Sequence, residues 1–244
     1  MNKIALVTGA YKGLGFEWVR QLAKDGYTVY LTARSLQKAQ KAVDQLEKEG
    51  FKAIPKALDV TNEEELSHLA SEIEKEYGHI DLIVNNAGIN SKDDPDKSVF
   101  MKSFRLQELD AGEVLRHIHV NGIAPVLVVK HFKALLEKSE KPVVINISSW
   151  LGSIAKKDFG GHYGYATSKA ALNMMNKALA LEIKQYGITT IVLNPGWVQT
   201  DMGGSKAPLT AEQSVRSAID KVLSTITLEQ TGEFFQWDGT PHPW

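Results

Sequence analysis

The segment KIALVTGAYKGLG, residues 3–15, decides the fold of this chain. Its apolar first half predicts a buried strand, and Gly9, Gly13 and Gly15 follow that strand in a G-x3-G-x-G spacing. Glycines at such a turn let the backbone bend tightly and approach a pyrophosphate, which then lies at the N-terminus of the next helix. A glycine-rich turn with no ligand would show the same spacing. Its position at the first strand-to-helix junction favours a dinucleotide site.

Further short apolar segments alternate with longer amphipathic ones along the chain. The segments expected to form strands are residues 27–34, 52–60, 80–86, 142–148 and 188–194. They are rich in Val, Ile and Leu with little alternation, as strands buried on both faces are. These repeated units predict a single-domain α/β Rossmann fold over residues 1–244. We expect a doubly wound parallel sheet of about seven strands, with helices on both faces.

Helices are expected between the strands. One covers residues 35–50, and another begins at Thr61, where TNEE forms a capping box with Glu64. A third covers residues 167–187 and ends at a glycine. The polar residues 90–112 are expected to form a loop with one short helix.

Composition and short motifs exclude several classes of function. The 28 basic and 29 acidic residues give a net charge of -1, which offers no electrostatic reason to bind nucleic acid or an anionic membrane. The absence of cysteine excludes disulfides, thiolate metal sites and cysteine nucleophiles. No metal is expected, because no H-E-x-x-H spacing occurs, and the absence of G-x-S-x-G disfavours an α/β-hydrolase. No apolar run approaches the roughly 18 residues of a spanning helix, and the N-terminal run is too short for a signal peptide. A cytoplasmic protein is therefore expected.

The end of the second expected strand indicates which dinucleotide is bound. A site for an unphosphorylated ribose carries Asp or Glu there, which accepts a hydrogen bond from the 2′-hydroxyl. This chain has LTARS instead, with Arg34 and no acid, and arginine suits a 2′-phosphate. Lys12 in the glycine turn could reach the same phosphate. Both side chains could also be solvated surface charges, but the missing acid together with the added base favours NADPH.

The segment HYGYATSK, residues 162–169, contains two candidate tyrosines for proton transfer. Tyr165 and Lys169 are four residues apart and share one face of a helix, whereas Tyr163 and Lys169 are six apart and do not. Lys169 can therefore support Tyr165 and not Tyr163. A partly buried tyrosine with a satisfied hydroxyl would give the same pattern without any chemistry. A choice between the two interpretations needs the rest of the chain.

Six motifs in order resemble those of the short-chain dehydrogenase/reductase family. Besides the glycine turn they are NNAG (85–88), HVNG (119–122), INISS (145–149), YATSK (165–169) and NPGWVQTDM (194–202). The resemblance covers residues 3–237, nearly the whole chain. The run NPGWVQTDMGGSKAPLT and the ending WDGTPHPW further resemble the carbonyl-reductase branch of this family, which includes the proteins called C-factor and sniffer.

The resemblance implies a nicotinamide cofactor, hydride transfer to or from a carbonyl carbon, and four catalytic residues. Tyr165 would donate the proton, and Lys169 would lower the pKa of Tyr165 and bond the nicotinamide ribose. Ser149 would orient the substrate oxygen, and Asn121 would hold a water that links Lys169 to solvent. Ser148 competes for the serine role, and the resemblance favours Ser149. Ser149 lies 16 residues before Tyr165, a few more than is usual in the family.

The resemblance also implies a set of cofactor contacts. The residues expected to bind the cofactor are Gly9, Lys12, Gly13, Leu14, Gly15, Arg34, Asp59, Val60, Asn86, Ala87, Gly88, Tyr165, Lys169, Pro195, Gly196, Val198 and Thr200. Asp59 and Val60 would hold the adenine, NNAG the side of the adenine ribose, and PGWVQT the nicotinamide. Taken without the resemblance, Asn85 and Asn86 could be plain turn residues, and Asp59 a helix-entry residue.

These observations together predict NADPH-dependent reduction of aldehydes, ketones, diketones or quinones. An NAD-dependent alcohol dehydrogenase is one alternative, and Arg34 argues against it. A C-factor-like signalling protein that binds the dinucleotide without physiological turnover is another, and the presence of all four catalytic positions argues against that.

Four further expectations concern the surroundings of the site and the assembly of the chain. Trp150 and Trp197 would either line a broad apolar pocket or belong to the core, and the short segment after Thr200 would form a small mobile cover at best. Lys156 and Lys157 are expected in a solvated loop. Apolar residues on more than one face of the helices around 112–138 and 164–186 indicate a homodimer or homotetramer.

Overall fold

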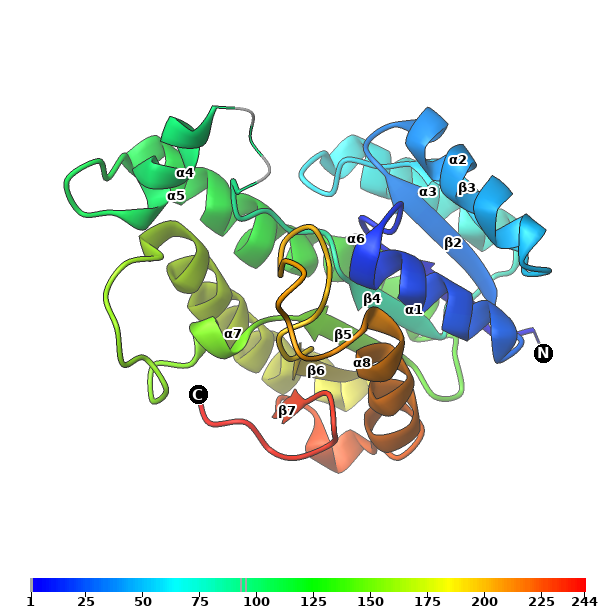
Figure 1. Ribbon diagram of the computed structural model, residues 1–244. Coiled ribbons are helices and arrows are strands. Elements are labelled where there is room, and N and C mark those ends of the chain that lie inside the picture. The colour runs from blue at the N-terminus through cyan, green and yellow to red at the C-terminus, as the bar shows by residue number, and fades with distance from the viewer. Residues whose placement is uncertain (1, 93, 95) are drawn as a thin grey trace.

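A seven-stranded parallel sheet forms the centre of the molecule in the computed structural model, which describes residues 2–92, 94 and 96–244 (Figure 1). The strands are β1 (Ile4–Val7), β2 (Thr28–Ala33), β3 (Ile54–Ala57), β4 (Leu82–Asn85), β5 (Val143–Ile147), β6 (Thr189–Asn194) and β7 (Phe234–Gln236). Their order in the sheet is β3-β2-β1-β4-β5-β6-β7, and every pair is parallel. The order reverses between β1 and β4, where a doubly wound sheet opens a crevice at its carboxyl edge.

Helices connect the strands and cover both faces of the sheet. The α-helices are α1 (Gly13–Lys24), α2 (Leu36–Lys48), α3 (Glu63–Glu76), α4 (Lys97–Phe104), α5 (Ala111–Ile118), α6 (Ala124–Leu136), α7 (Tyr163–Ile183) and α8 (Ala211–Ala218). Shorter turns are η1 (His119–Ile123), η2 (Trp150–Gly152), η3 (Lys184–Tyr186), η4 (Ile219–Leu223) and η5 (Leu228–Gln230). The predicted single-domain Rossmann fold is confirmed.

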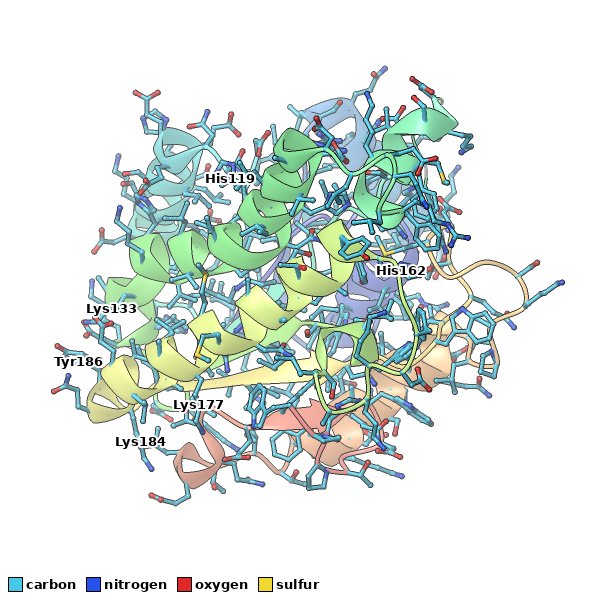
Figure 2. The ribbon with its side chains drawn as sticks, turned by 90° about the vertical axis from the view of Figure 1, so that its left-hand side faces the viewer. His119, Lys133, His162, Lys177, Lys184 and Tyr186 are labelled. Carbon is cyan, nitrogen blue, oxygen red and sulfur yellow. The ribbon has the colours of Figure 1, made fainter. Side chains whose placement is uncertain are left out.

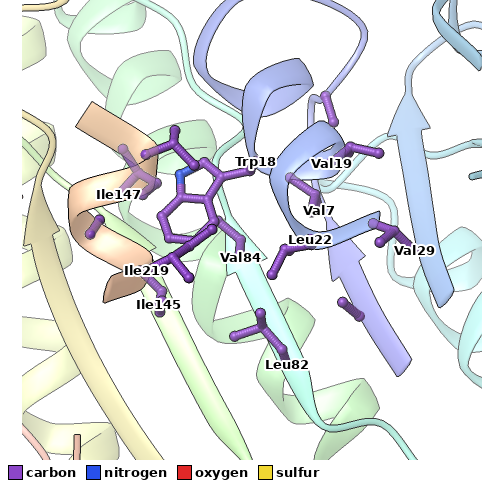
Figure 3. Packing of buried hydrophobic residues seen from close by; sticks show 14 of the residues in the cluster. Val7, Trp18, Val19, Leu22, Val29, Leu82, Val84, Ile145, Ile147 and Ile219 are labelled. Atoms are coloured by element: carbon purple, nitrogen blue, oxygen red, sulfur yellow. The ribbon is translucent and has the colours of Figure 1, made fainter. Parts of the chain in front are cut away.

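Alternating side chains of the strands divide the core into two clusters. Ala5 and Val7 of β1 pack with α1, α2 and α8 on one face, whereas Ile4 and Leu6 pack with α3 and α6 on the other. Figure 3 shows the Trp18 ring of α1 among hydrophobic side chains of the first cluster, between the sheet and the helix that carries Ile219. The continuous apolar strands predicted from the sequence follow from this arrangement, because both faces of each strand are covered.

The helix starts predicted from the sequence differ in two places. Helix α3 is capped by Asn62 and not by Thr61: the Asn62 side chain accepts hydrogen bonds from the backbone N–H groups of Glu64 and Glu65. The Thr61 hydroxyl instead donates to the Asp59 carboxylate at 2.7 Å. Asparagine and threonine are both good N-caps, but the Thr61 hydroxyl is engaged by Asp59, and Asn62 caps the helix instead.

Helix α7 begins four residues earlier than predicted, at Tyr163, and ends at Ile183. His162 precedes it in a left-handed conformation with φ of 59°. Gly187, also left-handed at φ of 75°, follows the turn η3 and ends the helical segment as predicted.

The polar region 90–112 contains α4, the one short helix predicted there, and the first residues of α5. Asp93 and Pro95 of its loop lie outside the described residues. Within the described part of the chain, no helix is long and apolar enough to cross a membrane.

Candidate active site

Four loops meet at the carboxyl edge of the sheet, after β1, β4, β5 and β6. They carry the glycine turn, NNAG, the serine pair and the PGWVQT segment, in that order along the chain. Strands β1 and β4 are direct neighbours, as are β4 and β5, and β5 and β6. The sheet therefore brings together residues that are up to about 190 positions apart in the sequence.

The glycine turn packs against NNAG so tightly that side chains are excluded. A Cβ on Gly9 would lie 2.8 Å from Ala87 Cα, and one on Gly15 would lie 2.8 Å from Ala10 Cα. Gly9 and Gly13 have φ of 61° and 58°, in the left-handed region that favours glycine. Leu14 packs against the core cluster that contains Trp18. The turn thus leaves bare backbone at the N-terminus of α1, as an approaching pyrophosphate requires.

Asn86 and Thr8 fix this turn to the loop after β4. The Asn86 side chain donates to the carbonyl oxygens of Thr8 and Gly9 at 2.9 and 3.0 Å. The Thr8 hydroxyl accepts from the backbone N–H groups of Asn86 and Ala87. Asn86 is therefore more than a plain turn residue. Thr8 was not predicted, although a threonine at the end of a buried strand is a signal for such a bond.

Asn85 points away from this turn and into the protein. Its side-chain amide donates to Asn146 Oδ1 at 2.8 Å, and Asn146 in turn donates to Asn176 Oδ1 at 2.8 Å. This buried chain of amides links β4, β5 and α7. A positional role beneath the site therefore fits Asn85, rather than a contact with a ligand.

Positively charged side chains gather at the end of β2. Arg34 is exposed there, and the Nζ atoms of Lys12 and Lys38 lie 5.6 and 5.3 Å from the centre of the Tyr11 ring. Ser35 caps α2 without a side-chain hydrogen bond of its own. Arg34, the two lysines and this helix N-terminus favour a bound anion. Lys38 was not predicted, because a lysine in a helix is ordinarily a surface charge.

Asp59 and Val60 follow β3, the neighbour of β2, at the same edge of the sheet. Val60 is buried in the core cluster that contains Phe132. Burial alone would raise the pKa of the Asp59 carboxyl, but hydrogen bonds from Thr61 and the nearby charge of Arg34 hold the pKa below its usual value. Asp59 is thus both a helix-entry residue and an ionised group facing Arg34.

The two serines after β5 differ in their surroundings. Ser148 donates to Asn173 Oδ1 at 2.7 Å and is buried. Ser149 lies near the Tyr165 phenol, and its hydroxyl accepts from the backbone N–H of Leu151 at 3.2 Å. The geometry therefore favours Ser149 as the partner of Tyr165, since the hydroxyl of Ser148 is engaged elsewhere.

The two tyrosines of α7 also differ. Tyr163 is 37% exposed, whereas Tyr165 is half-buried beside Ser149. Burial raises the pKa of Tyr165 to about 12, and the hydrogen bond from Ser149 offsets only part of that rise. In the protein alone the phenol is thus protonated at neutral pH, and the lowering of its pKa expected with a bound nicotinamide stays a prediction.

Lys169 lies near the phenol but forms its hydrogen bond elsewhere. Its ammonium donates to the Ile147 carbonyl oxygen at 2.7 Å and lies 5.8 Å from the centre of the Tyr165 ring. Only 4% of the residue is exposed, and burial lowers its pKa to about 8. Tyr165 and Lys169 share a helix face as predicted, but the ammonium bonds the end of β5 rather than the phenol.

Asn121 lies in the π-helical turn η1 between α5 and α6. Its side chain accepts from the N–H of Ile89 at 2.8 Å and donates to the Ile89 carbonyl at 2.8 Å and to Ser168 at 2.9 Å. The amide therefore holds the backbone that follows NNAG. A Cβ on Gly88 would lie 3.2 Å from Asn121 Oδ1 and 3.7 Å from Lys169 Nζ, so this glycine keeps the space between them open. The expected water contact stays a prediction.

A cluster of polar side chains holds the next residues of the same loop. Ser91 is buried with φ of 59°, and its hydroxyl donates to Glu113 and accepts from Arg116 at 2.9 Å. The fully buried ring of His117 lies 3.4 Å from the same hydroxyl. Sequence patterns gave no sign of this cluster, because its members come from two separate polar segments.

The segment after β6 forms a compact loop. Gly196 has φ of 79°, and a Cβ there would lie 2.7 Å from Leu209 Cδ1. Val198 pairs with Leu209, and the Thr200 hydroxyl accepts from the N–H of Gly203 at 3.1 Å. Lys12 of the glycine turn forms an ion pair with Asp201 of this loop at 2.7 Å.

Asn194 joins this loop to the serine pair, a role not predicted from the sequence. Its side-chain oxygen accepts from the backbone N–H groups of Trp150 and Gly196, both at 3.2 Å. The Pro195 carbonyl accepts from Ser214 of α8 at 2.7 Å. The start of the PGWVQT segment is therefore fixed on both sides.

Trp150 and Trp197 both lie outside the hydrophobic core. Trp150 is 36% exposed and Trp197 is 52% exposed. The Trp150 ring lies 5.8 Å from that of Phe159, and the Trp197 indole donates to the Gly203 carbonyl at 2.8 Å. Of the two alternatives, membership of the core does not fit this exposure, and the place of both residues beside Ser149 and Pro195 fits a pocket wall.

The glycine turn lies at the same edge of the sheet as Ser149, Tyr165 and Lys169. This combination defines a class of protein. Residues 3–210 match the family described as short chain dehydrogenase. The chain therefore belongs to the short-chain dehydrogenase/reductase family of oxidoreductases, as the motifs predicted.

Individual relatives agree with this membership. C-signal of Myxococcus xanthus is 34% identical over 167 residues, which cover 68% of this chain and 94% of that protein. The carbonyl reductase Sniffer of D. melanogaster has a similar structure, with a TM-score of 0.88, 31% identity and 100% of both chains covered. The NADPH-bound carbonyl reductase from chicken fatty liver gives a TM-score of 0.87 and 29% identity, and covers 100% of this chain and 99% of that chain. The predicted similarity to carbonyl-reductase-like proteins is confirmed.

Proposed function

We propose that this chain reduces carbonyl compounds to alcohols with NADPH as the cofactor. One observation carries the proposal: Tyr165 lies beside Ser149 and shares a helix face with Lys169, at the sheet edge where the glycine turn lies. NADPH, when bound, supplies the hydride for the carbonyl carbon. Solved carbonyl-reductase relatives of similar structure support this choice of substrate class and cofactor.

The residues present fit this cofactor. The bare backbone of Gly9, Gly13 and Gly15 would hold the pyrophosphate. Arg34 and Lys12, with the N-terminus of α2, would hold the 2′-phosphate.

Tyr165 donates a proton to the carbonyl oxygen, which needs a phenol that is protonated at neutral pH. Its raised pKa satisfies this requirement. Ser149 orients the same oxygen by hydrogen bonding. Lys169 holds a positive charge near the phenol that favours the phenolate after the proton has left.

Turnover of a panel of aldehydes, ketones, diketones and quinones, followed by NADPH absorbance, tests the proposal. Reduction of several neutral carbonyl compounds supports it. Absence of turnover across the panel, with cofactor binding intact, would instead favour a signalling protein without physiological turnover, and oxidation of alcohols with NAD would favour an alcohol dehydrogenase.

Replacing Arg34 with alanine should remove most of the preference for NADPH. We expect the unmutated protein to bind NADPH more tightly than NADH by roughly 1.5–3 kcal/mol, because a charge-assisted phosphate contact contributes about that much. Fluorescence titration of both cofactors measures the difference. Lys48→Ala, at the far end of α2, is the matched control and should keep the preference. Equal affinity for both cofactors in the unmutated protein would refute the assignment.

We also propose that the chain forms a homodimer or homotetramer through α5, α6 and α7. Figure 2 shows this face, on which α7 runs beside the helical segment that contains His119. Leu115, Met174 and Leu181 are exposed there by 64%, 71% and 75%. Light scattering at micromolar concentration should give more than the monomer mass, because burying such residues between copies is favourable.

Charges on this face should dissociate the assembly. We expect the double variant Met174→Glu and Leu181→Glu to give a monomer. Leu36→Glu places the same charge on α2, where Leu36 is 54% exposed, and should leave the mass unchanged. A monomeric mass for the unmutated protein would exclude the assembly.

A further inference from the structure

The first turn of α7, which carries Tyr165, packs against two helices that the proposed reaction does not yet involve. Helices α4 and α5 lie side by side, and both contact α7 (Figure 1). Gly164 directly precedes Tyr165 and is buried at this contact. A Cβ on Gly164 would lie 2.7 Å from Ser103 Cβ of α4 and 3.2 Å from His117 Nδ1 of α5. The turn therefore lies closer to Ser103 and His117 than a residue with a side chain would allow.

His117 is held firmly on its own side of this contact. Its ring is fully buried, and Nδ1 donates to the Glu113 carbonyl oxygen at 2.9 Å, since a carbonyl oxygen only accepts. Nε2 faces the Ser91 hydroxyl at 3.4 Å. That hydroxyl also bonds Glu113 and Arg116. The ring is thus fixed in place, with Nδ1 and Cγ as its atoms nearest to a Cβ on Gly164.

Ser91 connects this histidine to the loop that is expected to contact the cofactor. It lies three residues after NNAG, in the loop that follows β4. Its φ of 59° is strained for a residue other than glycine, and such strain persists only where surrounding contacts impose the conformation. The bonds to Glu113 and Arg116 are contacts of this kind. His117 therefore lies between the loop after NNAG and the turn that carries the proton donor.

A second connection between the same two segments runs through Asn121. Its amide accepts from Ile89 of the loop and donates to Ser168 of α7. The Ser168 hydroxyl donates in turn to the Tyr165 carbonyl oxygen at 2.7 Å. Asn121 thus supports the C-terminal side of the turn, and the contact at Gly164 supports its N-terminal side.

We propose that His117 and Ser103 are positioning residues for Tyr165. Together they form the surface that sets how close the first turn of α7 lies to the loop after NNAG, and hence where the phenol lies relative to the cofactor. The inference rests on the proposed reductase function and adds two residues that act through Tyr165 rather than on the substrate. Proton transfer needs the phenol within hydrogen-bond reach of the substrate oxygen. A shift of this turn should therefore slow turnover without weakening cofactor binding.

Gly164→Ala tests the contact from the side of the tyrosine. Its new methyl group would overlap Ser103 Cβ, so the packing of the turn must shift. We expect kcat for a neutral ketone to fall by about 10- to 100-fold, with KM and the Kd of NADPH unchanged within about twofold. The solvent deuterium isotope effect on kcat should rise, because proton transfer from a displaced phenol limits the rate more strongly. 

Gly160→Ala, four residues earlier, is the matched control. A Cβ at Gly160 would meet no atom of the described residues within 4 Å. This variant should keep kcat within about twofold, as a surface substitution does.

Two further changes test the contact from its opposite side. Ser103→Gly deletes the carbon nearest to the new methyl group, so the double variant Gly164→Ala with Ser103→Gly should recover most of the lost kcat. His117→Ala removes the ring and should lower kcat by about 10-fold. His117→Asn keeps Cγ and a nitrogen near the place of Nδ1, and should retain most of kcat. A role in stability alone would not couple Ser103→Gly to Gly164→Ala in kcat.

Three results would overturn the inference: full kcat in Gly164→Ala, no recovery in the double variant, or equal losses in His117→Ala and His117→Asn. Hydrogen exchange separates the inference from the proposed function, because it needs no turnover. Gly164→Ala should alter exchange in peptides of residues 162–170 but not in those of residues 172–183, and the double variant should restore it. If the unmutated protein reduces no carbonyl compound, the reductase proposal fails, whereas unchanged exchange at 162–170 would exclude the contact itself.

Discussion

Tyr165→Phe should lower kcat/KM for carbonyl reduction by about 10²- to 10⁴-fold, the range that general acid catalysis contributes. The variant removes only the hydroxyl that lies beside Ser149, and it keeps the ring in place. Cofactor affinity should change little, because Arg34 and the glycine turn are untouched. Steady-state kinetics with NADPH and a neutral ketone, together with a fluorescence titration of NADPH, measure both quantities.

Tyr163→Phe is the matched control for this experiment. Tyr163 lies two residues away on the same helix but is 37% exposed. We expect this variant to retain activity within about twofold, as a surface substitution does. An inactive Tyr163 variant beside an active Tyr165 variant would show that the helix-face argument selects the wrong tyrosine.

The fold was predictable because its signals are local and repeated. The six strands expected from the sequence contain β1 to β6, and the glycine turn lies where a doubly wound sheet reverses. A seventh strand was expected from the fold class, but no segment was assigned to it. The three residues of β7, Phe234 to Gln236, are too few to show a pattern. The start of α3 was missed by one residue, since Thr61 and Asn62 are both suitable caps and only the contact with Asp59 decides between them.

The candidate site was predictable in its residues but not in its electrostatics. Spacing placed Tyr165 and Lys169 on one helix face, and the family resemblance favoured Ser149 over Ser148. Spacing cannot show that the Lys169 ammonium reaches the Ile147 carbonyl, a contact across 22 residues that depends on the packing of α7 against β5. Nor can it show that the Lys157 nitrogen, expected in a solvated loop, is buried against the Phe159 ring.

Lys169→Met should abolish most turnover and stabilise the protein at neutral pH. Burial lowers the pKa of Lys169 to about 8 from an ordinary value of 10.5, and each unit of pKa corresponds to about 1.4 kcal/mol. At pH 7 the folded protein therefore carries a cost of about 3 kcal/mol for the buried charge. The variant leaves the Ile147 carbonyl without its donor, which costs about 1–3 kcal/mol. We expect a net gain of up to about 2 kcal/mol in the free energy of unfolding, measured by urea denaturation.

The pH dependence of stability distinguishes this explanation from a simple packing effect. Below pH 8 Lys169 is protonated in both the folded and the unfolded state, so the full cost is present. Between pH 8 and about 10.5, Lys169 is deprotonated in the folded state but still protonated in the unfolded state. The free energy of unfolding of the unmutated protein should therefore rise with pH over this range, because the folded state no longer contains the buried charge. Lys169→Met should lack that rise, whereas Lys184→Met, a control just beyond the end of α7, should keep it.

A Lys169 variant that is less stable than the unmutated protein at pH 7 would mean that the ammonium holds the fold together. If it is instead more stable and inactive, the charge is retained at a cost in stability, which is what a catalytic role requires and a structural role does not.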